Sequence, residues 1–176
     1  MSNTKVVTGR ARLSYVNLFT PRAQNEGQDA KYSVCVLIPK SDTKTVNAIK
    51  AAIEAAKEAG KASWGGKVPP GLKVPLRDGD TERDTAEYKG HWFINASSKN
   101  RPGVVDANVQ AILDSDQVYS GCYGRVSINF YAYNTNGNRG IAAGLGNVQK
   151  VADGEPLSGR TRAEDDFTAV EEDFLS

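Results

Sequence analysis

Two tyrosines, Tyr131 and Tyr133, have the type and spacing needed to hold a flat ligand by stacking. They fall on the polar side of an alternating stretch, residues 125–133, whose apolar side consists of Val126, Ile128, Phe130 and Ala132. Alternation of this kind, with β-branched and aromatic residues, is typical of a half-buried strand. Asn136-Gly137 follows and best fits a two-residue type I′ turn. The sequence therefore predicts a β-hairpin within residues 118–151.

With Thr135 opposite Asn138, the pairing of the two strands is fixed. The apolar face pairs Ala132 with Ile141, Phe130 with Ala143, and Ile128 with Leu145. The other face pairs Tyr133 with Gly140, Tyr131 with Ala142, Asn129 with Gly144, and Ser127 with Gly146, with Arg125 and Arg139 near its ends. Glycine weakens a strand, but small neighbours leave flat rings uncovered, and aromatic platforms flanked by cations hold single-stranded nucleic acid without reading its sequence. An equally compatible interpretation is that the tyrosines pack under another segment and the glycines mark a close backbone approach.

Aromatic and basic residues recur in the first two predicted strands, Arg10 to Phe19 and Lys31 to Ile38. The stacking candidates of the whole chain are Tyr15, Phe19, Tyr32, Tyr131 and Tyr133. The candidates for tracking phosphates are Arg12, Lys31, Lys99, Arg101, Arg125 and Arg139. No set of Asn, Gln and Arg is evident for reading base edges, so we expect little sequence preference.

The net charge of +1 conceals a strong asymmetry along the 176 residues. Residues 163–176 hold six acids and no base, which leaves 15 acids against 22 bases in residues 1–162, a net charge of +7. A basic body with an acidic tail suggests a polyanionic ligand and a tail that mimics it. The tail residues expected to occupy the basic surface or to anchor partner proteins are Asp165, Asp166, Phe167, Glu171, Glu172, Asp173 and Phe174.

The sequence gives little support for catalysis, a cofactor or a metal. His91 is the only histidine, no phosphate-binding loop ending in Gly-Lys-Ser/Thr is present, and no nucleophile–base pair stands out. The acidic run of Asp78, Asp80, Glu82 and Asp84 could bind Mg²⁺, but acids on a loop are more often simply solvated. We therefore expect a binding protein rather than an enzyme.

Other features indicate a cytoplasmic protein. Cys35 and Cys122 lie far apart in strand-like segments, which predicts buried thiols rather than a disulfide or a zinc site. No run approaches the roughly 20 apolar residues of a membrane span, and residues 1–10 lack the apolar core of a signal peptide.

The remaining elements favour a mainly β fold. A helix is expected from Thr43 to Ala59, a strand from His91 to Ser97, and a short helix from Asp106 to Leu113, while residues 1–9 should be frayed. Residues 61–90 form a long loop that could fold over a ligand or be a neutral insertion. We predict a five-stranded OB-fold-like barrel with one long helix, spanning residues 1–151, followed by a flexible acidic tail, residues 152–176.

Three runs, RLSYVNLFTP, KYSVCVLIPKSD and YSGCYGRVSINFYAYNTNGNRGIAAGLGNVQKV, resemble a family of phage single-stranded-DNA-binding proteins with an OB-fold, formerly known only as a domain of unknown function. The ending EEDFLS is similar to the acidic, phenylalanine-bearing ends of such proteins from T7-like phages and bacteria, although Phe174 is third from the end here. The resemblance implies a sequence-nonspecific protein that coats and protects single-stranded DNA during phage replication or recombination. It implies replication or recombination proteins as partners, and is compatible with a homo-oligomer. The alternative is a β-rich scaffold or virion accessory protein whose tail recruits another protein.

Overall fold

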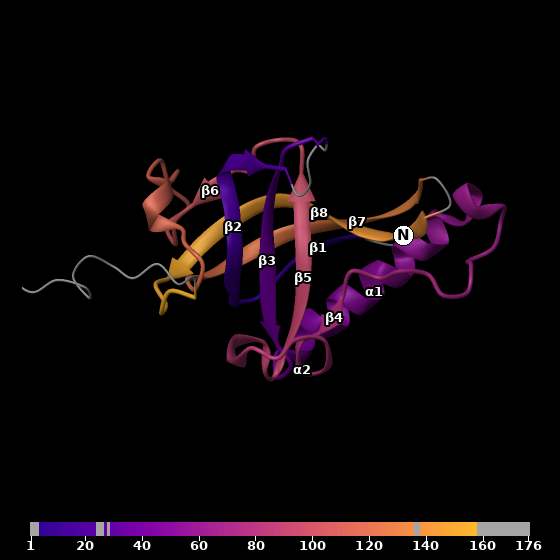
Figure 1. Ribbon diagram of the computed structural model, residues 1–176, viewed down its shortest axis with the longest axis horizontal. Coiled ribbons are helices and arrows are strands. Elements are labelled where there is room, and N and C mark those ends of the chain that lie inside the picture. The colour runs from indigo at the N-terminus through magenta and orange to yellow at the C-terminus, as the bar shows by residue number, and fades with distance from the viewer. Residues whose placement is uncertain (1–3, 24–26, 28, 136–137, 158–176) are drawn as a thin grey trace, which may run out of the picture.

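Five long strands close into a barrel in the computed structural model, which describes residues 4–23, 27, 29–135 and 138–157. These strands are β2 (Ala11–Arg22), β3 (Lys31–Pro39), β5 (His91–Ser98), β7 (Tyr123–Thr135) and β8 (Asn138–Ala152). Antiparallel pairs join β2 to β3, β3 to β5, β7 to β8 and β2 to β7, and one parallel pair joins β5 to β8. This ring of pairings confirms the predicted five-stranded, OB-like barrel, and Figure 1 shows β2, β3 and β5 crossing in front of β7 and β8.

Three short strands extend the sheet: β1 (Lys5–Val7) pairs with β7, β4 (Arg77–Asp78) with β5, and β6 (Val104–Val105) with β8. The expectation that residues 1–9 are frayed is therefore wrong for β1. Its ladder continues on both sides, since Phe130 donates its N–H to the carbonyl of Thr4 and Thr8 donates to that of Val126. Strand β2 also continues past its predicted end at Phe19 and pairs Arg22 with Lys31.

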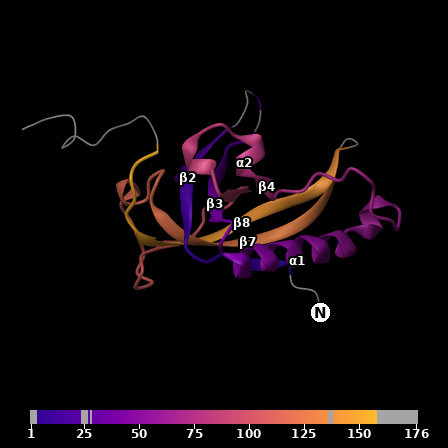
Figure 2. The same cartoon turned by 90° about the horizontal axis from the view of Figure 1, so that it is seen from below.

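Helix α1 (Thr43–Ala59) forms over the predicted residues. The Asp42 carboxylate caps its start by accepting from the Thr45 N–H. The buried stripe, which includes Val46, Ile49, Ala52, Ile53 and Ala56, packs against β1 and β7 on one side of the barrel (Figure 2). Gly60 follows with an ordinary φ of −86°, and it suits this position because a Cβ there would lie 2.3 Å from the Cβ of Ala132.

Residues 61–90 are more ordered than the predicted loop. They contain the 3₁₀ turns η1 (Lys61–Trp64) and η2 (Ala86–Tyr88), strand β4 and the short helix α2 (Gly79–Glu82). Trp64 is buried, and its Nε1 donates to the carbonyl of Tyr133, 3.3 Å away. The segment is thus fastened to the hairpin of β7 and β8.

The short helix predicted from Asp106 to Leu113 does not form. After β6 the chain makes a tight turn in which one Asp106 carboxylate oxygen accepts the N–H groups of Asn108 and Gln110. Aspartate side chains stabilise turns in this way and compete with helix formation. The only helical turn in this part of the described chain is η3 (Ser115–Gln117).

The main core fills the barrel and the space beneath α1. Its fully buried side chains include Leu13, Val36, Ile94, Ile128 and Phe130. A smaller cluster lies on the outer surface of the barrel and consists of Cys35, Leu37, Tyr88 and Phe93, with Leu157 packed against it. No helix among the described residues is long and apolar enough to cross a membrane.

Candidate nucleic-acid interface

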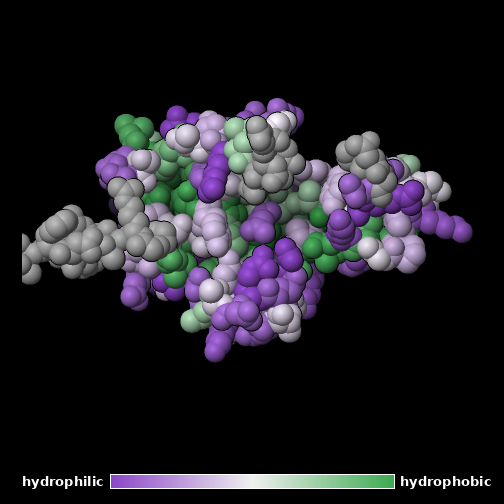
Figure 3. All heavy atoms as spheres, viewed as in Figure 1, coloured by the Kyte–Doolittle hydropathy of each residue, from purple (hydrophilic) through white to green (hydrophobic). Residues whose placement is uncertain are grey.

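A groove of about 1300 Å³, here called the polar groove, runs over the outer faces of β2, β3 and β5. Strand alternation turns Val34 and Ile94 inward and leaves small polar side chains outside. Ser33 pairs with Ser97, and Cys35 pairs with Asn95, which makes a floor without bulky groups. Strands β2, β3 and β5 face the viewer in Figure 1, and Figure 3 shows hydrophilic side chains gathered at the lower end of this face.

Tyr15 projects from β2 beside this floor and is 67% exposed. Its φ of +48° is in the left-handed region, where β2 is irregular and its pairing register with β3 shifts between Ser14 and Asn17. A non-glycine residue in this region is strained, and such strain concentrates at functional sites. The bulge leaves a large, flat ring uncovered beside the groove, as the stacking interpretation requires.

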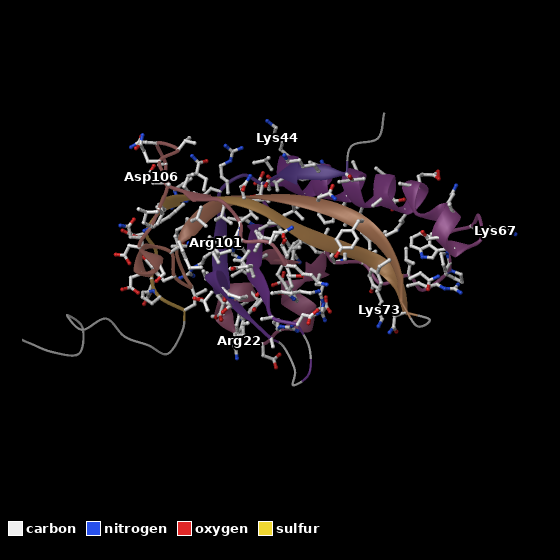
Figure 4. All side chains as sticks on the ribbon, turned by 90° about the horizontal axis from the view of Figure 1, so that it is seen from above. Arg22, Lys44, Lys67, Lys73, Arg101 and Asp106 are labelled. Carbon is white, nitrogen blue, oxygen red and sulfur yellow. The ribbon has the colours of Figure 1, made fainter. Side chains whose placement is uncertain are left out.

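Basic side chains accompany this ring. Lys31 and Lys99, both predicted from sequence, line the polar groove with Arg22, which is labelled in Figure 4. Lys99 lies 3.7 Å from Asp29, but both side chains are largely exposed, so the pair is weak and easily exchanged for another anion. The structure therefore brings together Tyr15, Lys31 and Lys99 from three different strands or their ends.

The hairpin adopts the predicted register from Thr135/Asn138 to Ile128/Leu145. The turn residues Asn136 and Gly137 lie outside the described residues. The register then shifts by one, so the predicted pairing of Ser127 with Gly146 is wrong. The Ser127 hydroxyl accepts the Asn147 N–H at 2.7 Å, and this contact accompanies the bulge.

The face of small residues on β8, here called the small-residue lane, comprises Gly140, Ala142 and Gly144. Tyr131 is 46% exposed and lies across Gly144, where a Cβ would come 3.4 Å from its ring. Because Gly144 pairs with Ser97 of β5, the lane continues the floor of the polar groove. Figures 2 and 4 agree that the hairpin curls toward the side of the groove.

The far end of the lane fits the other interpretation, in which the glycine marks a close backbone approach. Gly140 is buried beneath Lys73, whose carbonyl accepts the Ile141 N–H at 2.8 Å. A Cβ on Gly140 would lie 2.7 Å from that carbonyl and 2.7 Å from the Tyr133 hydroxyl. Tyr133 is accordingly half-buried, whereas Tyr131 is open.

Several other predicted residues are engaged elsewhere. The Arg12 guanidinium donates to the carbonyls of Glu155, at 2.7 Å, and Gly121, at 3.3 Å. Arg125 donates to the carbonyl of Thr8 at 3.0 Å. These contacts fasten chain segments to the barrel and occupy part of each guanidinium.

Phe19 and Tyr32 are half-buried against the main core, which leaves little of either ring for a ligand. The Arg101 guanidinium lies 5.8 Å from the centre of the Phe19 ring. Arg139 is exposed, but it precedes Gly140 and so lies on the other face of β8 from the small-residue lane. These residues surround the barrel rather than lining the polar groove.

Three acids of the run considered for Mg²⁺ instead pair with basic side chains. Lys40 lies 2.7 Å from both Asp78 and Asp80, which raises the pKa of Lys40 and lowers the pKa of each carboxyl. Glu82 pairs with Arg77 at 2.8 Å, and its pKa is lowered as well. No group of acids, histidines or cysteines within the described ranges could hold a metal ion.

Residues 78–88, here called the folded acidic segment, contribute two groove residues that the sequence did not suggest, Arg83 and Tyr88. Arg83 lies among acids, and Tyr88 follows a run without strand or helix periodicity, so no local pattern marks either. Burial raises the pKa of the Cys35 thiol to about 11, although a hydrogen bond with Tyr88 opposes the rise. Both cysteines are buried and free, as predicted.

The predicted tail contacts, from Asp165 to Phe174, lie outside the described residues. The segment that leads to them is described as far as Leu157. Leu157 packs on the outer cluster with Cys35 and Leu37, and its N–H donates to the carbonyl of Ser120 at 2.8 Å. Leu157 therefore lies on the face of the barrel that carries the polar groove.

Comparisons with known proteins place the chain among phage proteins. The family model built on the single-stranded-DNA-binding protein of Enterobacter phage Enc34 matches residues 4–175. A curated relative is putative protein p50 of Acyrthosiphon pisum secondary endosymbiont phage 1. It is 36% identical over an alignment 186 residues long, which covers 97% of this chain and 98% of the relative.

Solved structures agree. The single-stranded-DNA-binding protein from bacteriophage Enc34, solved in complex with single-stranded DNA, is 28% identical, with a TM-score of 0.79 over 88% of this chain and 90% of its own. The single-stranded-DNA-binding protein gp2.5 of bacteriophage T7 is 18% identical, with a TM-score of 0.62 over 96% of this chain and 95% of its own, which shows a likeness of fold.

Proposed function

The chain belongs to the family of the phage Enc34 single-stranded-DNA-binding protein, and from this premise we propose that it binds single-stranded DNA without reading its sequence. The observation that carries the proposal is one continuous surface, the polar groove and the small-residue lane, with Tyr15 and Tyr131 uncovered on it. Bases stack on such rings, while Lys31 and Lys99 attract the phosphates. The strand would run from the groove across Gly144 to Tyr131.

This role is binding rather than catalysis. A protein that covers single strands protects them during phage DNA replication or recombination, in the cytoplasm of an infected bacterium. The scaffold alternative requires Tyr131 and Tyr133 to be covered by other segments. Tyr133 is partly covered, but Tyr131 is not, which favours the nucleic-acid role.

The direct test is a titration of the intrinsic tryptophan and tyrosine fluorescence with oligo-dT at several salt concentrations. Wild type should show saturable quenching, with log K falling by about 0.7 per decade of salt for each phosphate contacted. Tyr131→Ala/Tyr133→Ala should weaken binding, and Tyr15→Ala should weaken it as well. No quenching at low salt, even without residues 163–176, would reject the proposal.

Residues 152–176 would act as a separate acidic tail that competes with DNA for the groove and recruits replication or recombination proteins. The position of Leu157 supports this role. Glu164 is seven positions further along the chain, so the first acids can reach about 25 Å from the outer cluster. Deleting residues 163–176 should tighten DNA binding at low salt. An unchanged affinity would remove the competition.

A further inference from the structure

We infer that Arg83 is a phosphate-binding residue, placed at the end of the polar groove away from Lys31 and Lys99 by the folded acidic segment. The inference rests on the proposed function and names a contact that no local sequence pattern indicated. Arg83 stacks on Phe93, which pairs with Leu37, six residues along β3 from Lys31. At about 3.3 Å per residue this separation is roughly 20 Å, so the cations would hold the phosphates of one strand at both ends of the groove.

The Arg83 side chain is positioned before any ligand arrives. Its guanidinium carbon lies 4.8 Å from the centre of the Phe93 ring and 5.8 Å from that of Tyr88. Its Nη1 donates to the carbonyl of Glu82 at 2.8 Å. This contact uses one of the five N–H groups of the guanidinium, and the other four can donate to a phosphate. An exposed arginine held by stacking loses little further entropy when it binds.

Three of the five nearby acids are engaged with other cations. Within the described part of the chain, Asp78 and Asp80 pair with Lys40, and Glu82 pairs with Arg77. Asp84 and Glu87 do not line the polar groove. Arg83 has no ion pair in that part of the structure and does line the groove, so it is the cation of this segment left for a ligand.

The same acids hold the backbone that carries Arg83. Asp80 accepts the Gly90 N–H and Asp78 accepts the Asp80 N–H, both at 2.9 Å, while Glu82 accepts the Asp78 N–H at 3.0 Å. Lys40, which directly follows β3, joins these hydrogen-bonded residues to the barrel through ion pairs of 2.7 Å with Asp78 and Asp80. The acidic run thus positions a basic residue at a site for DNA.

The experiment compares Arg83→Ala with the matched control Arg77→Ala, using oligo-dT titrations across salt. Both variants remove one arginine that lies near Phe93 in the same segment, but Arg77 is already paired with Glu82. Loss of one phosphate contact by Arg83→Ala should lower the salt slope by about 0.7, which weakens binding about eightfold at ~0.05 M salt and about threefold at ~0.2 M. Arg77→Ala should leave the slope near that of wild type.

Two further variants keep the test informative if alanine disturbs the segment. Arg83→Lys should retain most of the salt slope. Arg83→Gln, which is of similar size but neutral, should lower the salt slope by about 0.7, as Arg83→Ala does. Wild-type slopes in Arg83→Ala and Arg83→Gln, with wild type binding normally, would overturn the inference alone. Equal losses in the Arg77 and Arg83 variants would also overturn it. Absence of binding by wild type would instead reject the proposed function.

Discussion

Tyr15 should lower the stability of the fold and strengthen DNA binding. Replacing it with glycine should therefore raise the stability and weaken the binding. Its φ of +48° costs an L-residue about 1–2 kcal/mol. Glycine removes this cost but adds about 0.4–1 kcal/mol of unfolded-state entropy. Since the side chain is 67% exposed, little packing is lost. We therefore expect Tyr15→Gly to raise the free energy of unfolding by about 0.5–1 kcal/mol, or roughly 1–4 °C in Tm.

The same substitution removes a stacking platform. A base stacked on an aromatic ring contributes about 1–3 kcal/mol, so Kd for oligo-dT should rise roughly 5- to 150-fold. Tyr15→Ala is the matched control, because alanine loses the ring but keeps the left-handed strain. It should bind as weakly as Tyr15→Gly without the gain in stability, and Tyr15→Phe should resemble wild type in both respects.

The assays are thermal unfolding followed by circular dichroism and the oligo-dT titration at one salt concentration. A Tyr15→Gly protein that is less stable than Tyr15→Ala would refute the strain argument. Wild-type affinity in both variants would refute the assignment of Tyr15 as a platform.

Three other outcomes follow from the structure. Gly140→Ala should destabilise the fold by about 1–3 kcal/mol in urea titrations, because its Cβ would lie 2.7 Å from a backbone carbonyl; an unchanged midpoint would contradict the close approach. The folded-state pKa of Asp80 is lowered, so its stabilising contacts are complete above the usual Asp pKa of about 4 and lost as pH falls through the folded value. The protection factor of the Gly90 amide, which is the intrinsic exchange rate divided by the observed rate at the same pH, should therefore fall in acid, and an unchanged protection factor would contradict this role of Asp80. Burial raises the pKa values of Cys35 and Cys122, so both thiols should resist a thiol reagent near neutral pH until the protein unfolds, whereas rapid labelling of native protein would show that they are accessible.

Local sequence patterns were enough to predict most of the barrel. The apolar alternation and the Asn136-Gly137 pair were enough to predict the hairpin register as far as Ile128, because a two-residue turn leaves one way to align the strands. The bulge at Ser127 could not be predicted, since it depends on a side-chain contact with Asn147 across the pair. Strand β1 was missed because three residues pair with β7 only in the folded barrel.

The candidate site was predicted in part. Tyr15, Lys31, Lys99 and Tyr131 do share one surface. Lys31 and Tyr131 occupy outward-facing strand positions, whereas the exposure of Tyr15 depends on the irregularity of β2, which strand alternation does not predict. The role of Arg83 could not be predicted, because it depends on a fold in which Asp78, Asp80 and Glu82 pair with other cations. The helix expected from Asp106 is absent, because a local turn captures that carboxylate.

The most direct measurement is photo-crosslinking of the full chain to oligo-dT containing 5-iododeoxyuridine, with the adducts located by mass spectrometry. The account predicts adducts at Tyr15 and Tyr131, with none at the core-packed Phe19. Competition by excess unlabelled oligo-dT should abolish both. Specific adducts confined to Tyr119 and Tyr123, which do not line the polar groove, would contradict the assignment of the polar groove and the small-residue lane as the DNA-binding surface.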